Sequence, residues 1–364
     1  MTIITEHSIK LAVNMPKGDV HAKMEVFYNP VMVSNRNISI LLLNCIKNTD
    51  MKIADPLAGS GIRSLRFLNE LSREKIGEMH VNDMKAHFEK TMENALELNK
   101  MQWPKNMFIH TEDASLFLMH NNGFDYIEID PFGSPNPFLA AAMARISRGG
   151  VLAVTATDTA ALTGTYPRVT VRKYWGKSIK NHMMHEMGLR ILIRKIQLLG
   201  VQFDRAMVPM LSYHKDHYFR TYFRCEKGKE KCDALLKQVQ YFLYCSECLG
   251  FKTSLYNKEK CECGGEYEFV GPLWIGKLFE KDLVEKMVAK NTFAEEEKFL
   301  EVLLEEACQE RAGFYDVHEF ARKLKINPPR MEEMLEKTKG VRTHFSPTGI
   351  KTKMKVEEVM GVMK

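Results

Sequence analysis

Four short apolar runs in the first 130 residues each end at or close to an acidic residue. The acids are, in chain order, Asp55, Asp83, Asp113 and Asp130. Apolar runs that end abruptly in a turn are typical of buried parallel strands. In open α/β sheets the ligand crevice lies outside the carboxyl ends of such strands. The pattern therefore predicts an α/β fold with acids around a binding site, and four acids in strand order favour function over coincidence.

The first apolar run leads into a turn that contains Gly59 and Gly61, followed by a helix with a leucine-rich face. Strand, glycine turn and helix form the nucleotide-binding corner of a doubly wound sheet, because glycine lets the backbone approach a ligand closely. The turn lacks both the GxGxxG spacing and the basic residue of a P-loop, which argues against a dinucleotide or a triphosphate. Asp83 ends the second strand, where an acid hydrogen-bonds ribose hydroxyls.

The fourth apolar run, Phe124 to Ile129, ends in Asp130-Pro131-Phe132-Gly133-Ser134-Pro135. Pro131 donates no N–H and Pro135 stiffens the exit, so we expect a rigid loop with available carbonyl groups. An acid, a free carbonyl and an aromatic ring suit a planar base that carries an exocyclic amine. An aspartate that only caps the next turn explains this stretch equally well, so both interpretations stay open at this point.

The composition is that of an ordinary globular protein, with 45% hydrophobic and 27% charged residues in 364. This length predicts two domains. We place the boundary near Cys225, before the charged run that begins at Glu226, which gives domains 1–225 and 226–364. The net charge of +6 is compatible with nucleic acid. No apolar run is long enough to span a bilayer and no signal peptide is evident, so we expect a cytoplasmic protein without a membrane association.

Four of the eight cysteines form a cluster, Cys245, Cys248, Cys261 and Cys263. Two thiolate pairs on turns can close a tetrahedral zinc site, although the second pair has one intervening residue rather than the usual two. In a cytosolic protein, structural zinc is favoured over disulfides. Because sulfur would take all four positions, the zinc would have no open site for catalysis. Its predicted role is to fold a small knuckle.

The order of the motifs resembles that of the class I S-adenosylmethionine-dependent methyltransferases. A narrower resemblance is to the tRNA (guanine-26, N2) dimethyltransferases of archaea and eukaryotes, and it extends as far as Arg342–Gly349. The motifs that carry it are Phe27-Tyr28-Asn29-Pro30, Asn35-Arg36, Gly61-Ile62-Arg63, Asp130–Pro135 and Thr157-Asp158-Thr159-Ala160. One departure is His7, which follows Glu6 where we expect glycine, and it bears on the N-terminal arm alone.

This resemblance implies a Rossmann-like, seven-stranded class I methyltransferase domain. It also implies an enzyme that methylates N2 of guanine 26 in tRNA to N2-methyl- and N2,N2-dimethylguanosine, with S-adenosylmethionine as the donor. The implied cofactor-binding residues are Arg36, Asp55, Gly59, Gly61, Arg63, Arg66, Asp83, Asp113 and Ala114. Asp83 would hold the ribose, and Asp113 with Ala114 the adenine. The arginines suit either the cofactor carboxylate or RNA phosphate, and the sequence leaves this open.

The same resemblance assigns the catalytic residues. The carboxylate of Asp130 and the carbonyl of Pro131 would accept the amine hydrogens of guanine and orient the amine toward the methyl donor, with Asp130 as general base. Phe27 and Phe132 would clamp the base, which stabilises it by about 1–3 kcal/mol per stacked base. That contact would offset the few kcal/mol that a base loses when it leaves its stack.

We expect a fifth strand over residues 151–158 and a long helix over residues 178–199. Two final strands, over 201–213 and 217–225, would complete the sheet, the last of them antiparallel. Between the fifth strand and the long helix, basic residues alternate with aromatic ones, among them Arg168, Arg172 and Trp175. Such a stretch suits an RNA surface, and a solvated loop is an equal alternative.

Beyond the cysteine cluster we expect helices over 277–289 and 292–308. Residues 317–339 resemble a helix-turn-helix and the basic end, 342–355, the hairpin of a winged helix. The C-terminal domain is therefore expected to be α+β and to bind tRNA, with protein packing as the alternative role. No obligate protein partner is evident.

Two other functions remain open. One is a different nucleic-acid amino-methyltransferase, acting on ribosomal RNA or DNA. The second is a non-catalytic tRNA-binding factor on the same scaffold. Asp130 followed by Phe-Gly-Ser-Pro favours guanine by resemblance. The glycine turn, the four acids and Phe27 count against a non-catalytic factor.

Overall fold

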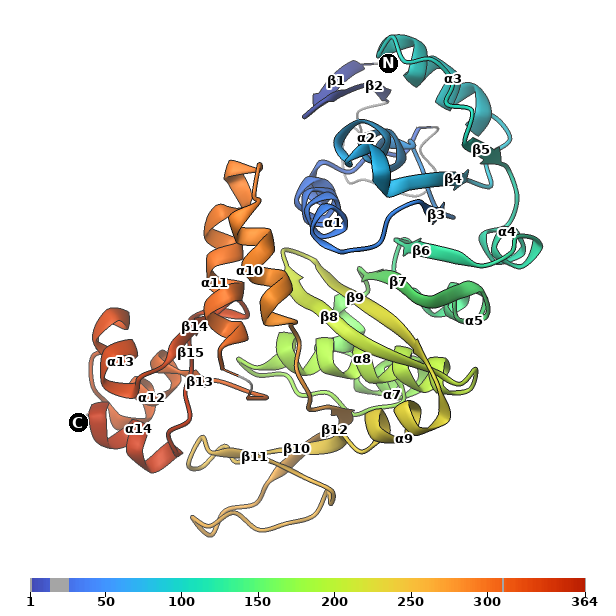
Figure 1. Ribbon diagram of the computed structural model, residues 1–364. Helices are drawn as coiled ribbons and strands as arrows, with labels where there is room; N and C mark the ends of the chain where they lie inside the picture. Colours follow the sequence, from blue (N-terminus) through green and yellow to red (C-terminus); the bar gives the residue numbers. More distant parts are fainter. Residues whose placement is uncertain (1, 14–25, 310, 364) are drawn as a thin grey trace. The chain divides into compact units, whose positions relative to one another are not determined.

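The computed structural model describes residues 2–13, 26–309 and 311–363 (Figure 1). The chain forms two compact units, each made of three segments. The first comprises Met1–Ala156, Tyr222–Glu226 and Ala289–Glu296, and the second comprises Thr157–Thr221, Lys227–Val288 and Glu297–Lys364. The predicted domain boundary near Cys225, between residues 1–225 and 226–364, stays a prediction.

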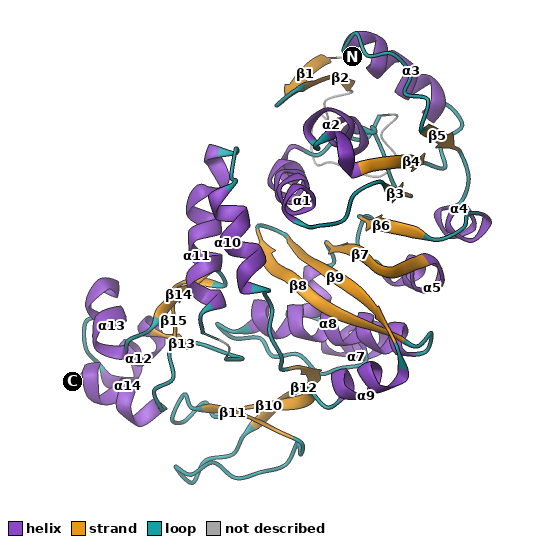
Figure 2. Cartoon of the chain, in the orientation of Figure 1, coloured by secondary structure: helices purple, strands orange, loops and turns teal. Residues whose placement is uncertain are grey.

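A seven-stranded sheet has the strand order β5-β4-β3-β6-β7-β9-β8 (Figure 2). The strands are β3 (Met51–Asp55), β4 (Ile76–Asn82), β5 (Met107–His110), β6 (Phe124–Ile129), β7 (Ile146–Ala156), β8 (Arg205–Lys215) and β9 (Tyr218–Lys227). The strands from β3 to β7 pair in parallel. Because a two-residue turn joins β8 to β9, these two run antiparallel. The predicted seven-stranded, mostly parallel α/β sheet is confirmed.

The centre of this sheet is apolar throughout. Ala54 of β3 pairs with Ile127 of β6, which in turn pairs with Leu152 of β7, and each is 0% exposed. Strands covered on both faces carry continuous apolar runs rather than alternating ones, which explains the sequence pattern. The register also brings the carboxyl ends of β3 and β6 to one edge of the sheet, where the acids follow.

The first unit also contains five α-helices and an N-terminal hairpin. The helices are α1 (Val33–Cys45), α2 (Ile62–Glu70), α3 (Phe88–Leu98), α4 (Ala114–His120) and α5 (Asn136–Arg145). The antiparallel hairpin pairs β1 (Thr2–Glu6) with β2 (Ile9–Val13). The side chain of Asn29 accepts a hydrogen bond from the Val31 N–H and starts a 3-10 turn at Pro30, and α1 follows from Val33.

The second unit combines helices with two small sheets. Its helices are α6 (Thr159–Leu162), α7 (Pro167–Tyr174), α8 (Met184–Val201), α9 (Lys229–Leu236), α10 (Lys281–Ala289), α11 (Glu297–Ala307), α12 (Val317–Leu324), α13 (Met331–Thr338) and α14 (Val356–Met363). One sheet has the order β11-β10-β12, made of β10 (Val239–Tyr244), β11 (Phe251–Ser254) and β12 (Glu268–Trp274). The other has the order β13-β15-β14, made of β13 (Tyr315–Asp316), β14 (Val341–Thr343) and β15 (Ser346–Lys351).

Several predicted elements of this unit have other bounds, since α10 begins at Lys281 rather than 277 and α11 at Glu297 rather than 292. The long helix begins at Met184 rather than near residue 178, because the Asn181 side chain accepts a hydrogen bond from the Met183 N–H at 2.9 Å and forms a turn there. The stretch for which a loop was an alternative contains helix α7, with Pro167 at its start, where a missing N–H costs nothing. Across the described residues, every helix is too short or too polar to cross a bilayer.

Buried charges join helices α8 and α11 to strand β15. Glu186 accepts hydrogen bonds from Arg190 Nε and Lys351 Nζ, each at 2.9 Å. Glu306 accepts from the His344 backbone N–H at 3.1 Å and ring Nδ1 at 2.6 Å, and lies 3.2 Å from Lys351 Nζ. Lys351 therefore balances two carboxylates that are at most 2% exposed.

We predict that Glu306→Gln lowers the free energy of unfolding by about 3–5 kcal/mol at neutral pH, because it leaves buried cations without their partner. Burial raises the pKa of Glu306, but His344 and Lys351 outweigh it and bring the pKa from 4.5 to about 2. A lowered folded-state pKa stabilises the fold above pH 4.5, and this stabilisation is lost as the pH falls toward 2. Urea denaturation at a series of pH values measures the difference between variant and wild type.

That difference should shrink between pH 4.5 and about 2, since the wild type then loses the same charge. Glu333→Gln is the matched control, because Glu333 pairs with Lys337 at the surface and its loss should change little. A difference that stayed constant down to pH 2 would contradict the role of the Glu306 charge.

Candidate functional site

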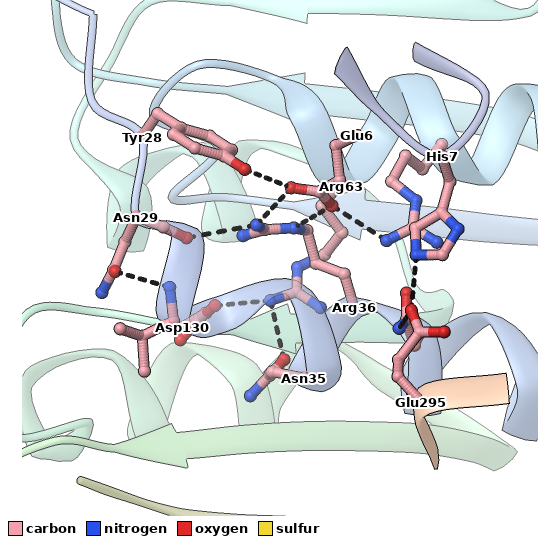
Figure 3. A network of polar contacts seen from close by, with 12 residues as sticks. Glu6, His7, Tyr28, Asn29, Asn35, Arg36, Arg63, Asp130 and Glu295 are labelled. Carbon is pink, nitrogen blue, oxygen red and sulfur yellow. Dashed lines mark hydrogen bonds and ion pairs between the residues drawn. The ribbon is translucent and has the colours of Figure 1, made fainter. Parts of the chain in front are cut away.

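The guanidinium group of Arg63, in the first turn of α2, lies at the carboxyl end of β6 (Figure 3). Its Nη2 donates to Asp130 Oδ2 at 2.5 Å and to Asn35 Oδ1 at 2.9 Å. Its Nη1 donates to Ser39 Oγ at 3.0 Å and lies 3.5 Å from Glu128 Oε2. Arg63 is 5% exposed, so this network is shielded from water and joins β6 to helices α1 and α2.

Asp130 presents one carboxylate oxygen to Arg63 and keeps the second available. Its side chain is 19% exposed. Within the described part of the chain, Oδ1 of Asp130 makes no hydrogen bond. A ligand N–H at this edge of the sheet can therefore donate to Oδ1 while Arg63 fixes the orientation of the carboxylate.

Two aromatic rings, one of them two residues after Asp130 in the chain, contact each other. The ring centroids of Phe27 and Phe132 are 4.3 Å apart with an interplanar angle of 69°, an edge-to-face contact. Phe132 is 49% exposed. The two rings touch, so a base can enter between them only if one ring swings away.

The glycine turn after β3 has a backbone that other residues adopt poorly. Gly59 and Gly61 have φ values of +60° and +74°. A Cβ at Gly61 would lie 2.1 Å from Met92 Sδ, and one at Gly59 would lie 3.2 Å from Phe27 Cδ1. The Gly59 N–H donates to Asp83 Oδ2 at 3.0 Å, so the turn and the acid that follows β4 form one local structure.

The other two acids of the series differ in exposure. Asp55 is 2% exposed and accepts from Ser64 Oγ at 2.7 Å; burial raises its pKa to about 7, although Arg63 and Ser64 act in the opposite direction. Asp113 is exposed and caps α4, because its Oδ1 accepts from two backbone N–H groups. Ala114, the first residue of α4, is 4% exposed. Asp55 is therefore buried behind the glycine turn and bonded to helix α2. Asp113 Oδ2, in contrast, makes no hydrogen bond with the described residues.

Arg36 and Arg66 meet at a carboxylate that sequence reasoning missed. Glu6 is 4% exposed and accepts from Arg36 Nε at 2.7 Å, Arg36 Nη2 at 2.6 Å and Arg66 Nη1 at 2.8 Å. The Tyr28 hydroxyl donates to it at 2.9 Å. Burial raises the pKa of Glu6, but the two arginines bring it to about 2. The sequence carried no signal for Glu6, since a lone acid in a polar arm is ordinary.

The remaining nitrogens of these two arginines differ. Arg66 is 0% exposed, and its Nε and Nη2 donate to Glu70 at 2.9 and 2.8 Å. Arg36 Nη2 also reaches the Asn29 carbonyl at 3.2 Å, while its Nη1 makes no hydrogen bond within the described residues. Arg63 and Arg66 both point inward, as their spacing of three indicated, but they serve different carboxylates.

His7 occupies the turn of the N-terminal hairpin with a φ of +46°, a conformation that glycine adopts without steric cost. Its Nε2 lies 2.9 Å from Glu295 Oε1, and its ring contacts Phe293 edge-on at 5.0 Å. The position thus explains why glycine was expected there. We predicted that His7 would affect the N-terminal arm alone. Its side chain also contacts Phe293 and Glu295, which lie outside that arm.

The four predicted zinc ligands lie together in the second unit. The Sγ atoms of Cys245 and Cys263 are 3.6 Å apart, those of Cys248 and Cys261 are 3.5 Å apart, and all four lie within 4.8 Å of one another. Sulfurs around a tetrahedral zinc, with bonds of about 2.3 Å, stand about 3.8 Å apart. The geometry fits such an ion. No other group in the described residues is suited to a metal; His185 and His214 stack on each other instead.

Comparisons with known proteins agree on one family. A family model described as N2,N2-dimethylguanosine tRNA methyltransferase matches residues 3–364. The tRNA (guanine(26)-N(2)/guanine(27)-N(2))-dimethyltransferase of Aquifex aeolicus is 39% identical, over 100% of this chain and 96% of its own length. The tRNA (guanine(26)-N(2))-dimethyltransferase of Pyrococcus furiosus is 33% identical, over 100% and 99%. The structure of Trm1 from Pyrococcus horikoshii with S-adenosyl-L-methionine has a TM-score of 0.86 at 31% identity, over 100% of both chains.

We predict that Gly61→Ala lowers the free energy of unfolding by about 2–4 kcal/mol, because it adds a clash with Met92 to the strain of a positive φ. Gly133→Ala is the matched control. Gly133 has a φ of +79°, but a Cβ there would meet nothing within 4 Å, so only the strain remains. Denaturant unfolding of both variants measures the difference. Met92→Ala should be less harmful in the Gly61→Ala background than in the wild type, and equal effects would contradict the clash.

Proposed function

The chain belongs to the N2,N2-dimethylguanosine tRNA methyltransferase family, and from this premise we propose that it methylates the exocyclic N2 of guanine 26 in tRNA. The methyl donor is S-adenosylmethionine and the products are N2-methyl- and N2,N2-dimethylguanosine. At the site, the proposal rests on the geometry of Asp130. Its Oδ2 accepts a hydrogen bond from Arg63, and its Oδ1 is available for a ligand.

Asp130 and Pro131 position the amine. The lone pair of N2 is delocalised into the guanine ring, so the amine is a poor nucleophile until it is oriented. In the proposed complex its two hydrogens bond to Asp130 Oδ1 and to the Pro131 carbonyl. Asp130 takes the proton that the nitrogen loses as the new N–C bond forms. Much of the rate comes from in-line alignment of the reacting atoms.

The glycine turn and the strand-end acids hold the cofactor. The backbone at Gly59 and Gly61 lets the methionine part approach, Asp83 binds the ribose, and Asp113 with Ala114 binds the adenine. When bound, the sulfonium supplies an electrophilic methyl group. The P. horikoshii structure, which contains S-adenosylmethionine, supports this choice of donor.

Among the other assigned residues, Arg36 is best placed to bind a ligand directly, through Nη1. Arg63, Arg66 and Asp55 act through their neighbours, because their polar atoms are already hydrogen-bonded in a buried setting. Phe27 and Phe132 separate to admit the guanine ring and then stack on it.

The C-terminal region, residues 226–364, binds the tRNA in this proposal. Its end has the element order β13, α12, α13, β14, β15, which supports a winged-helix-like fold. Helix α13 carries Glu332, Glu333 and Glu336, so it does not present a basic face. The end of α12 and the exposed turn before α13 are basic instead, with Lys323 in the helix and Lys325 and Arg330 in the turn, and we assign this part to RNA phosphate.

The main test is methyl transfer from labelled S-adenosylmethionine to unmodified tRNA, followed by mass analysis of the nucleosides. We expect N2-methylated guanosine at position 26, and a fall in kcat of at least about 100-fold for Asp130→Ala, since a general base contributes 10²–10⁴. Asp282→Asn, which changes an exposed acid of α10, is the matched control. Transfer to another base would refute the assignment to guanine, and undiminished turnover by Asp130→Ala would refute the role of Asp130.

Guanine 27 is a second candidate target, because the name of the A. aeolicus relative includes it. Two tRNA transcripts separate the candidates, one with guanine only at position 26 and one with guanine only at position 27. Product from the second transcript would extend the activity to both positions.

We further propose that Cys245, Cys248, Cys261 and Cys263 bind one structural zinc ion in a knuckle formed by the turns that flank β11. We predict about one zinc per purified chain and a lower melting temperature after chelation. Cys248→Ser should lose the zinc, whereas Cys308→Ser, at an exposed thiol outside the cluster, should retain it. Elemental analysis and thermal unfolding measure both effects. A zinc-free protein with an unchanged melting temperature would count against the site.

A further inference from the structure

Helix α7 exposes a stripe that mixes cations with an apolar side chain and an aromatic ring. Arg168, Val171 and Arg172 follow the spacing i, i+3, i+4, which places them on one side of the helix, and Trp175 follows the last helical residue, Tyr174. All four are exposed, Val171 at 53% and Trp175 at 44%. We call these four residues the α7 face. Tyr166, just before the helix, is 58% exposed as well.

The Trp175 ring is held in place rather than left loose. Its backbone has a φ of +57°, in the left-handed region, and two hydrogen bonds keep it there. The Trp175 N–H donates to the Val171 carbonyl at 2.9 Å, and Arg194 Nη1 donates to the Trp175 carbonyl at 2.9 Å. Lys195 Nζ lies 2.8 Å from the centroid of the Trp175 ring, so a cation–π contact covers one face of that ring. The remaining ring surface faces outward.

The charges around this face are positive. Arg168 and Arg172 form no ion pair or hydrogen bond with the described residues. The nearby acids are already engaged, since Asp158 lies 3.5 Å from Lys173 Nζ and accepts from the Tyr174 hydroxyl, and Glu268 lies 3.4 Å from Lys177 Nζ. The exposed Trp175 ring and the two guanidinium groups that precede it in the chain therefore match a partner with planar faces and negative charge.

We propose that the α7 face binds an unpaired nucleotide of the substrate RNA, with its base stacked on Trp175 and the adjoining phosphates against Arg168 and Arg172. This combination of a stacking ring with cations is how proteins hold single-stranded nucleic acid. The inference rests on the proposed function for its choice of RNA. It adds a contact that is separate from the glycine turn and from Asp130.

RNA matches both features of this face, because its phosphates complement the positive charge of Arg168 and Arg172 and its bases offer planar faces to Trp175. Stacking on tryptophan tolerates any base, so the contact supplies affinity rather than sequence recognition.

The first experiment uses the fluorescence of Trp175. The chain has three tryptophans, Trp103, Trp175 and Trp274, and Trp274 is 4% exposed. In full-length Trp103→Phe protein, Trp175 is therefore the one exposed tryptophan among the three. Titration with unmodified tRNA should quench its emission. Titration of the same protein without RNA over a range of concentrations shows whether a second copy covers the ring instead, and a shift there would overturn the proposal.

The second experiment measures tRNA affinity and turnover together. Trp175→Leu, which keeps an apolar side chain, should weaken tRNA binding by about 5- to 100-fold. It should raise KM for tRNA at an unchanged kcat and an unchanged affinity for S-adenosylmethionine. Trp175→Phe should recover most of the binding. Trp103→Leu, at another exposed tryptophan, is the matched control.

The arginines give an independent readout. Arg168→Gln with Arg172→Gln should reduce the slope of log Kd against log salt concentration by about 2, since each phosphate contact contributes about 1. If wild type methylates tRNA while Trp175→Leu binds it normally, the inference fails and the proposed function stands. If wild type neither binds nor methylates tRNA, the proposed function itself fails.

Discussion

The buried guanidinium group of Arg63 is the interaction on which the active edge of the sheet depends. It spans β6 and helices α1 and α2, and it reaches Asp130, which is 67 residues away in the chain. It also lies 3.5 Å from Glu128, a carboxylate that is 0% exposed. An unbalanced charge in such a place costs several kcal/mol. Arg63 therefore stabilises the fold and, with the same atoms, orients the Asp130 carboxylate, to which we assign the role of general base.

A second cluster of charges ties the N-terminal hairpin to the same helices. Glu6 neutralises Arg36 and Arg66, and His7 beside it reaches Glu295. The hairpin is thus part of the architecture behind the site rather than a loose arm. Most polar side-chain atoms of these two clusters form hydrogen bonds with each other. Among the described residues, Asp130 Oδ1 and Arg36 Nη1 make no hydrogen bond and can therefore bind a ligand.

The aromatic pair indicates how binding energy must be distributed. Separating Phe27 from Phe132 gives up an edge-to-face contact of about 0.5–1.5 kcal/mol. In the proposed complex, stacking the base on these rings regains about 1–3 kcal/mol, and extracting that base from its helix costs a few kcal/mol. These terms nearly cancel. Capture of guanine alone therefore adds little affinity, and contacts elsewhere on the RNA, such as those proposed for α7, must supply it.

Local patterns in the sequence determined much of this protein. Strand β6 occupies the predicted residues, the glycine turn has the backbone that its residues require, and the four clustered cysteines lie together. Each of these follows from neighbouring residues, where spacing and backbone preference decide the outcome. Only the tertiary structure decided which carboxylate each arginine meets, that Glu6 is buried, and that Trp175 is exposed at the end of a helix. Those pairings join residues far apart in the chain, so they depend on strand register and helix packing.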